Sequence, residues 1–168
     1  MIQKKVLWIA LAVVVSIAFA VIAVSAAEED LAGTYKLVSS TRKILDTGEV
    51  LDTYGKHPTG YIMYGKDGRM LALIVRDDRP KPASIEKATP EQQAALFRSM
   101  IAYGGTYKFD GKSIEHHIDI SWNELWTGTT VIRDIRKEGD KLIYTTRPAP
   151  FSADGKVSVT TLIWEKVK

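Results

Sequence analysis

The stretch YGGTYKFDGKSIEHHIDIS, residues 103–121, holds two short runs in which apolar and polar residues alternate around a turn. Alternation with a period of two is typical of β-strands that bury one face. Between the runs stands Asp110-Gly111, a dipeptide that favours a tight hairpin turn. We therefore predict strands over residues 104–109 and 113–120, paired as an antiparallel hairpin.

The same pattern continues on both sides of this hairpin. Residues 59–64 and 69–75 flank Asp67-Gly68, which is a second hairpin signal. Further alternating or apolar runs lie over residues 33–44, 129–137, 141–147 and 156–167. About seven or eight strands at this spacing, separated by short turns, indicate an antiparallel barrel or sandwich.

One segment has a helical period instead. Residues 89–103 begin with Thr89 as a helix N-cap and Pro90 at the first helical position. Apolar residues then follow at helical spacing: Ala94, Leu96, Phe97, Met100 and Ile101. We predict one amphipathic helix here, placed so that it closes one end of a barrel.

The N-terminal segment differs sharply from the rest. A basic start, MIQKK, precedes an uncharged apolar run from Val6 to Val24 and then the small residues SAA. This order is typical of a secretory signal peptide, so we predict a signal peptide over residues 1–27, cleaved after Ala26 or Ala27. The apolar run is 19 residues long, near the length that spans a bilayer. An uncleaved N-terminal membrane anchor therefore stays the alternative.

Both alternatives place residues 28–168 outside the cytoplasm, because Lys4 and Lys5 would stay inside. We therefore expect one exported domain, periplasmic or secreted, which contacts a membrane only if the N-terminal segment is uncleaved. Removal of residues 1–27 takes away two lysines and no acid, which lowers the formal net charge from +3 to +1. A net charge this small does not supply the basic surface that phosphate binding needs, so we expect no nucleic-acid partner. The chain has no cysteine, which excludes disulfides and thiolate metal sites.

Five motifs, in order along the chain, carry a family resemblance: GTYKLVS, GKHPTGYIMYGKDGRMLALI, AYGGTYKFDGKSIEHHIDIS, WTGTTVIRDI and LIWEKV. Their order resembles that of the bacterial and fungal lipocalin-like domain family over residues 31–167. The resemblance implies an all-β fold with one helix, a calycin-type antiparallel barrel of about eight strands whose interior holds one small ligand. Two positions depart from lipocalin patterns: Tyr35 replaces a tryptophan, and Lys166 replaces an arginine.

The adjacent histidines, His116 and His117, project to opposite faces of their predicted strand, since side chains alternate along a strand. They cannot jointly chelate one metal ion. The face of His116 also carries three isoleucines: Ile114, Ile118 and Ile120. We expect His116 to lie inside the barrel, where a neutral imidazole either contacts a ligand or satisfies a buried polar group.

The other face of the same strand carries His117 with Glu115 and Asp119. We expect these three side chains to face solvent, where they would hold at most a weak cation. His57, the remaining histidine, lies in a predicted loop. A zinc or iron site needs further ligands from other strands, so we predict no metal and no cofactor.

Arginines and aromatic residues complete the candidate ligand-binding set. Arg76 and Arg133 each share a strand face with apolar residues, from which a guanidinium group can bind a ligand carboxylate bidentately. The alternative places them at the open rim of the barrel or pairs them with an acid such as Glu115 or Asp134. Aromatic side chains would form the walls. The predicted ligand contacts are His116, Arg133, Arg76, Tyr61, Tyr64, Trp122 and Trp126.

Three hypotheses for function follow. The leading one is an exported barrel that binds a small apolar or amphipathic molecule in its interior. The second is a barrel enzyme of the isomerase or cyclase type, in which His116 is the general acid or base beside an arginine. The third is a ligand-free interaction module of the cell envelope. The sequence has no G-x-S-x-G elbow, no cysteine and no glycine-rich phosphate loop, so it gives nucleophilic catalysis no local support. Nothing in the sequence indicates an oligomeric state.

Overall fold

The computed structural model describes residues 31–151 and 154–168. The predicted signal or anchor segment, residues 1–27, lies outside these ranges. Within them, no helix combines the length and the apolar character needed to cross a membrane. Export of the domain therefore stays a prediction.

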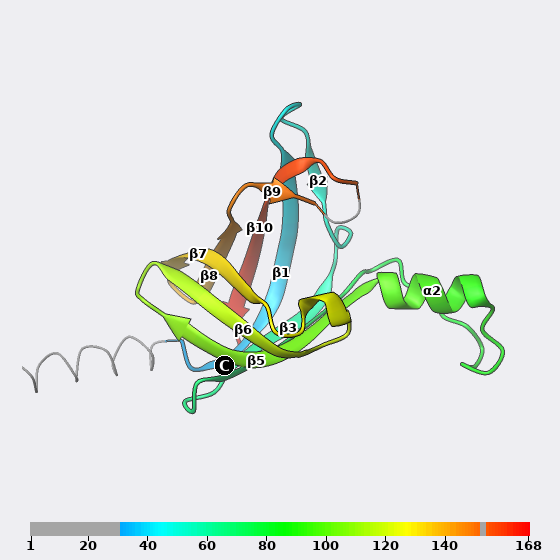
Figure 1. Cartoon of the computed structure of the whole chain (residues 1–168), viewed down its shortest axis with the longest axis horizontal. Helices are drawn as coiled ribbons and strands as arrows, with labels where there is room; N and C mark the ends of the chain where they lie inside the picture. The colour runs from blue at the N-terminus through cyan, green and yellow to red at the C-terminus, as the bar shows by residue number, and fades with distance from the viewer. Residues whose placement is uncertain (1–30, 152–153) are drawn as a thin grey trace, which may run out of the picture.

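Antiparallel strands close into a barrel (Figure 1). In the described ranges its eight strands are β1 (Gly33–Ile44), β3 (Thr59–Tyr64), β4 (Arg69–Val75), β5 (Met100–Phe109), β6 (Ser113–Ser121), β7 (Thr130–Glu138), β8 (Lys141–Thr146) and β10 (Val157–Lys166). Pairing between β1 and β10 closes the sheet on itself. Two short strands, β2 (Val50–Asp52) and β9 (Ala149–Pro150), pair with one end of β1 and of β10. The predicted antiparallel barrel of about eight strands is confirmed.

The turn between β5 and β6 forms as its sequence indicates. Gly111 has a φ of +91°, in the left-handed region that glycine adopts without steric cost. Before it, Asp110 Oδ1 accepts the backbone N–H groups of Ser113 at 2.6 Å and of Lys112 at 2.8 Å. These bonds lower the pKa of Asp110 to about 2. The carboxylate therefore holds the turn in place at neutral pH.

Side-chain alternation along β6 is interrupted once. His116 and Ile118 are buried, as predicted. Ile120 is predicted to share their face, but it is 68% exposed. The cause is a β-bulge: Gly104 pairs with Ile120 while Gly105 pairs with Ile118, so β6 carries one extra residue between them. An extra residue reverses the alternation beyond it, which turns Ile120 outward.

One end of the barrel is filled by side chains. Buried residues of several strands meet there, among them Tyr35, Met70, Tyr107, Ile114 and Leu142. None of these five lines the cavity described below. We call this the closed end, and we call the opposite end, where β4 and β8 finish, the open end.

The predicted helix is shorter than expected. It is α2 (Pro90–Arg98), and it begins with the expected cap, in which Thr89 Oγ1 accepts the backbone N–H of Gln92. It ends at Ser99, whose backbone N–H and hydroxyl bond back to carbonyls of the last turn. Met100 and Ile101, predicted to be helical, instead begin β5. Their pairing with β4 replaces helical hydrogen bonds with sheet hydrogen bonds.

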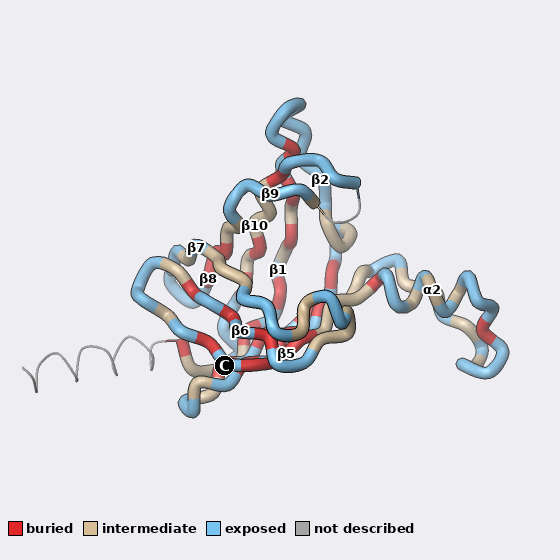
Figure 2. The backbone as a smooth tube through the Cα atoms, in the orientation of Figure 1, coloured by how far each residue is buried: buried red, intermediate tan, exposed pale blue. Residues whose placement is uncertain are grey.

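The helix also does not close the barrel. No residue of α2 is buried, and the helix projects from the side of the barrel (Figures 1 and 2). Only its C-terminal end approaches the open end, where the rings of Phe97 and Trp122 are 6.4 Å apart. Without an apolar face packed on the strands, α2 cannot serve as a plug.

A buried arginine fastens the loop between β9 and β10 to the barrel wall. Arg42 in β1 donates through Nη1 and Nη2 to the two carboxylate oxygens of Asp154, at 2.9 and 2.7 Å. The guanidinium also lies 4.1 Å from the ring centroid of Phe151. The Arg42 hydrogen bonds lower the pKa of Asp154 to about 2. Because Phe151 lines the cavity, this contact fixes one side of the open end.

Replacement of Arg42 by methionine is expected to loosen this loop. The variant keeps the apolar stem that contacts Phe151 and loses both bonds to Asp154. Cleavage at Lys156 by a lysine-specific protease should then become severalfold faster, because local opening precedes cleavage. Arg69→Met is the matched control, since Arg69 also pairs with an aspartate but lies exposed elsewhere. Equal cleavage rates in both variants would contradict the prediction.

Candidate ligand cavity

A cavity of about 660 Å³ occupies the open end of the barrel. Inward-facing residues of β3, β4, β5, β8 and β10 form its inner part, among them Ile62, Ala72, Tyr103, Tyr144 and Trp164. The segments after β2, β6 and β8 surround its mouth, including the 3-10 helix η1 (Glu124–Trp126). Most of the lining is aliphatic or aromatic, as in sites that bind small molecules.

Three tyrosines and a histidine form a continuous series of hydrogen bonds beside the cavity. His116 Nε2 lies 2.8 Å from the Tyr64 hydroxyl, and His116 Nδ1 lies 3.1 Å from the Tyr103 hydroxyl. Tyr144 donates its hydroxyl proton to Tyr64 Oη at 2.8 Å. All four residues are buried, and burial raises the pKa of each tyrosine, which keeps the hydroxyls protonated. We call these four residues the tyrosine–histidine network.

One arrangement of donors and acceptors gives every proton between Tyr144 and Tyr103 a partner. Burial, and to a smaller degree the charge of Arg133, lowers the pKa of His116 to about 3, so the imidazole is neutral at pH 7. A neutral imidazole has one N–H donor and one acceptor nitrogen. Tyr64 accepts from Tyr144, and its own proton has an acceptor when His116 Nε2 accepts it, which leaves Nδ1–H to donate to Tyr103. The hydroxyl proton of Tyr103 is then available to the cavity.

The four residues differ in their access to the cavity. Tyr103 and Tyr144 line it, whereas His116 and Tyr64 lie behind them. His116 was predicted either to contact a ligand or to satisfy a buried polar group, and the structure shows the second arrangement, with two tyrosine partners. An influence of His116 on a ligand therefore passes through Tyr103 directly, or through Tyr64 to Tyr144.

Arg133 projects from β7 into the interior, where it lines the cavity. Within residues 31–151 and 154–168 its side chain has one hydrogen bond, a long one from Nη1 to the carbonyl of Ile132 at 3.4 Å. Among the residues that the structure describes, no carboxylate forms an ion pair with it, including the predicted alternatives Glu115 and Asp134. Its positive charge also helps to lower the pKa of the buried His116.

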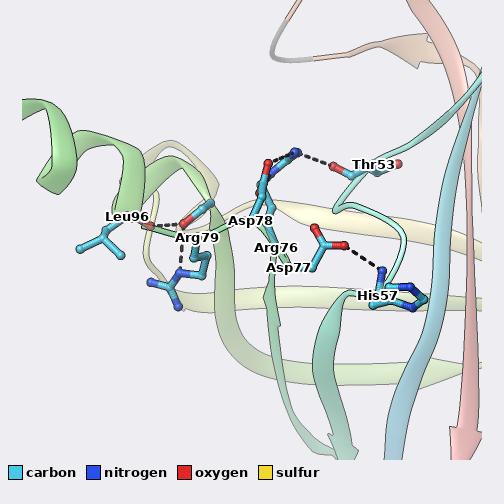
Figure 3. A network of polar contacts seen from close by, with 8 residues as sticks. Thr53, His57, Arg76, Asp77, Asp78, Arg79 and Leu96 are labelled. Atoms are coloured by element: carbon cyan, nitrogen blue, oxygen red, sulfur yellow. Dashed lines mark hydrogen bonds and ion pairs between the residues drawn. The ribbon is translucent and has the colours of Figure 1, made fainter. Parts of the chain in front are cut away.

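Arg76 lies at the mouth of the cavity, and its charge is already neutralised (Figure 3). Nε and Nη2 donate to the carboxylate oxygens of Asp78 at 2.8 and 2.9 Å, and Nη1 donates to the carbonyl of Thr53 at 3.0 Å. Beside it, the backbone N–H of His57 donates to Asp77 Oδ2 at 2.9 Å. Arg76 therefore fits the predicted alternative of a rim arginine paired with an acid, and it holds the loop after β2 against the end of β4.

Trp122 and Trp126 both line the cavity near η1. Their ring centroids are 5.0 Å apart in an edge-to-face arrangement, and the ring of Trp126 lies 5.7 Å from that of Tyr103. The indole N–H groups of Trp122 and of Trp164, deeper in the cavity, are buried without a hydrogen-bond partner. Buried polar groups usually have a partner, so these two unpaired donors are exceptions within the cavity wall.

The two tyrosines predicted from β3 take different positions. Alternation along the strand places Ile62 and Tyr64 inside and Tyr61 outside. Tyr61 is 43% exposed on the outer surface and does not line the cavity, which removes it from the candidate contacts. Tyr64 faces inward but lies toward the closed end, where it bonds to His116.

His117 lies on the outer surface, as predicted. Its Nε2 is 3.9 Å from Asp119 Oδ1, and Asp119 forms an ion pair with Arg69. The described part of the chain contains no group of three or more histidine or carboxylate side chains placed to hold a metal ion. Glu115, His117 and Asp119 therefore form no such group in the described structure.

Several lining residues were missed by the sequence analysis. Tyr103 was assigned to the predicted helix, although it belongs to the alternating pattern of β5. Arg98 and Arg147 also line the cavity, from the end of α2 and from the segment after β8. Arg98 is the last residue of a helix and Arg147 follows the end of a strand. The spacing of apolar residues does not predict side-chain direction where an element ends.

Comparison with known proteins supports the barrel. A family model described as lipocalin-like domain matches residues 32–167, a range that contains all eight barrel strands. No curated protein matches the chain, and no solved structure matches it.

Proposed function

The chain belongs to the lipocalin-like domain family, and we propose that it binds one small amphipathic molecule in the cavity at the open end of the barrel. The observation that carries this proposal is the cavity itself. Its volume of about 660 Å³ lies within the range of known small-molecule sites, roughly 300–1,000 Å³. A barrel without a ligand role would gain stability from filling that space with side chains.

The lining supports a ligand with an apolar body and a polar group. Trp122, Trp126 and Leu162 offer apolar surface, while Arg133 and Tyr103 offer hydrogen-bond donors among them. Few polar groups in an apolar wall are the usual means by which a pocket fixes the orientation of its ligand. The apolar part would supply affinity, and the polar part would supply selectivity.

The network argues against catalysis by His116 itself. Both ring nitrogens are occupied by tyrosines, and its low pKa makes the imidazole a weak base. A general base should be within hydrogen-bond reach of its substrate and have a pKa near the working pH. We therefore rank ligand binding above the isomerase or cyclase hypothesis.

Native mass spectrometry tests the proposal directly. The protein is purified under native conditions from cells that express the full chain, and its mass is compared before and after denaturation. We expect a small molecule that is released on unfolding. A bare protein mass that also stays unchanged after exposure to lipids and small amphipathic molecules would contradict ligand binding and favour the interaction module.

We further propose that the domain is exported through its N-terminal segment. The support is the basic, apolar and small-residue order of residues 1–27. The same mass measurement provides the test. A mature chain that begins at Ala27 or Glu28 would establish a cleaved signal peptide, and a full-length mass in the membrane fraction would establish the anchor instead.

A further inference from the structure

We propose that the polar group of the ligand is a carboxylate, bound by the Arg133 guanidinium together with the Tyr103 hydroxyl. This inference rests on the proposed function and names its ligand class: a small carboxylic acid with an apolar body. It is carried by the charge of the lining, by the missing partner of Arg133 and by the direction of hydrogen bonds in the tyrosine–histidine network.

The charged residues among the described lining of the cavity are all basic. Four arginines line the cavity, Arg76, Arg98, Arg133 and Arg147, and no acidic residue is among the described lining residues. Arg76 is neutralised by Asp78 outside the cavity, and the residues Arg98 and Arg147 are exposed at the mouth. A field of this sign attracts anions and repels cations.

Arg133 is the inner arginine of this set. It has only the long bond to Ile132, so most of its five N–H donors lack a protein acceptor among the described residues. A partly buried cation without a counter-ion is costly, and a carboxylate is the group that matches the planar fork of a guanidinium. An anion in the cavity would remove that cost.

The tyrosine–histidine network adds a donor of fixed direction. Tyr144 donates to Tyr64, Tyr64 to His116, and His116 to Tyr103, so the hydroxyl proton of Tyr103, which lines the cavity, has no acceptor within the network. With its acceptor site used by His116 Nδ1–H, Tyr103 serves a ligand best as a donor. His116 is therefore a positioning residue that fixes the polarity of Tyr103.

The donor set of the guanidinium agrees with this assignment. Its N–H groups can only donate, and a carboxylate offers several acceptor sites without a proton of its own. An alcohol would offer one neutral oxygen in their place, and a protonated amine would bring a second cation beside Arg133.

A matched pair of fluorescent probes tests the assignment. 1-Pyrenebutyrate and 1-pyrenebutanol share one aromatic body and differ in a carboxylate or a hydroxyl at the end of the same chain. Affinities are measured by fluorescence titration at pH 7.5 with the protein purified from cells that express the full chain. We expect the wild type to prefer the carboxylate by about tenfold, the strength of one hydrogen-bonded charge.

Three variants locate that preference. Arg133→Met should abolish it while leaving the affinity for the alcohol near its wild-type value, which also reports that the cavity is intact. Tyr103→Phe should reduce the preference severalfold. Arg136→Met is the matched control, because Arg136 lies on the same strand, its side chain is 68% exposed, and it pairs with Glu138. It should keep the full preference. If Arg133→Met does not fold, Arg133→Lys keeps the charge, loses the fork, and should lower the preference in part.

The outcomes separate this inference from the proposed function. Equal binding of both probes by the wild type, or a preference that survives Arg133→Met, overturns the carboxylate assignment and leaves small-molecule binding in place. Binding of neither probe, together with a bare mass in the native measurement, overturns both. Loss of the preference in Arg133→Met alone, with Arg136→Met unchanged, establishes the assignment.

Discussion

Replacement of Gly105 by alanine is expected to lower the free energy of unfolding by about 3 kcal/mol or more, since the new methyl group must displace backbone. A Cβ built on Gly105 would lie 1.9 Å from the carbonyl oxygen of His117 and 3.0 Å from the backbone nitrogen of Asp119. These are backbone atoms of the bulge in β6, so no side-chain rotation can relieve the clash. Urea unfolding followed by fluorescence measures the loss.

Gly104 provides a control one residue away. A Cβ there would meet Leu71 Cδ1 at 3.1 Å and the Met70 carbonyl oxygen at 3.3 Å. The leucine end is flexible and half exposed, so Gly104→Ala should cost about 1 kcal/mol, within the range of mild overpacking. Similar losses in Gly104→Ala and Gly105→Ala would contradict the assignment of the bulge as the sensitive point.

The bulge also explains what sequence alone can and cannot predict. The alternation of apolar and polar residues predicts that His116 and Arg133 face inward, because a period of two determines which face of the sheet a side chain lies on. It does not predict how far along the barrel axis a side chain lies. Ile62 and Tyr64 both face inward, yet only Ile62 lines the cavity, because Tyr64 lies nearer the closed end. A bulge, as at Ile120, is a tertiary feature that a strict period cannot contain.

The start of helix α2 is predictable from local sequence, but its end is not. A helical period over residues 89–103 predicts the start of α2 correctly, because a cap is a local signal that Thr89 and Pro90 carry. The end depends on partners far along the chain. Met100 and Ile101 pair with Val75 and Ile74, and these sheet bonds override the local helical preference. The same error hid Tyr103, one of the two network residues that line the cavity.

The second large effect is a loss of stability at acidic pH that depends on His116. Burial first, and the charge of Arg133 second, lowers its pKa in the folded protein to about 3, from an ordinary value of 6.5. Between these two values the unfolded chain binds a proton that the folded protein does not. The stabilising contribution is therefore complete above pH 6.5, and it is lost as the pH falls toward 3. The expected slope is about 1.4 kcal/mol per pH unit at most.

Urea unfolding at several pH values between 7 and 4 measures this slope. His116→Gln cannot take up the proton, so its unfolding free energy should be lower at pH 7 and should fall less steeply below pH 6. His117→Gln is the matched control, since it changes the adjacent residue on the exposed face of the same strand. It should follow the wild type at every pH. Parallel curves for His116→Gln and the wild type would contradict a neutral, buried His116.

The geometry of the network explains why protonation should be resisted. A second proton on His116 would make Nε2 a donor to Tyr64, which already accepts from Tyr144. The proton of Tyr64 would then lack its acceptor, and the whole series would have to reverse or break. Nitrogen chemical shifts of the imidazole observe this without a variant: a neutral ring with the proton on Nδ1 down to pH 4 is expected. A doubly protonated ring at pH 5 would refute the network, and with it the fixed donor that Tyr103 offers to the cavity.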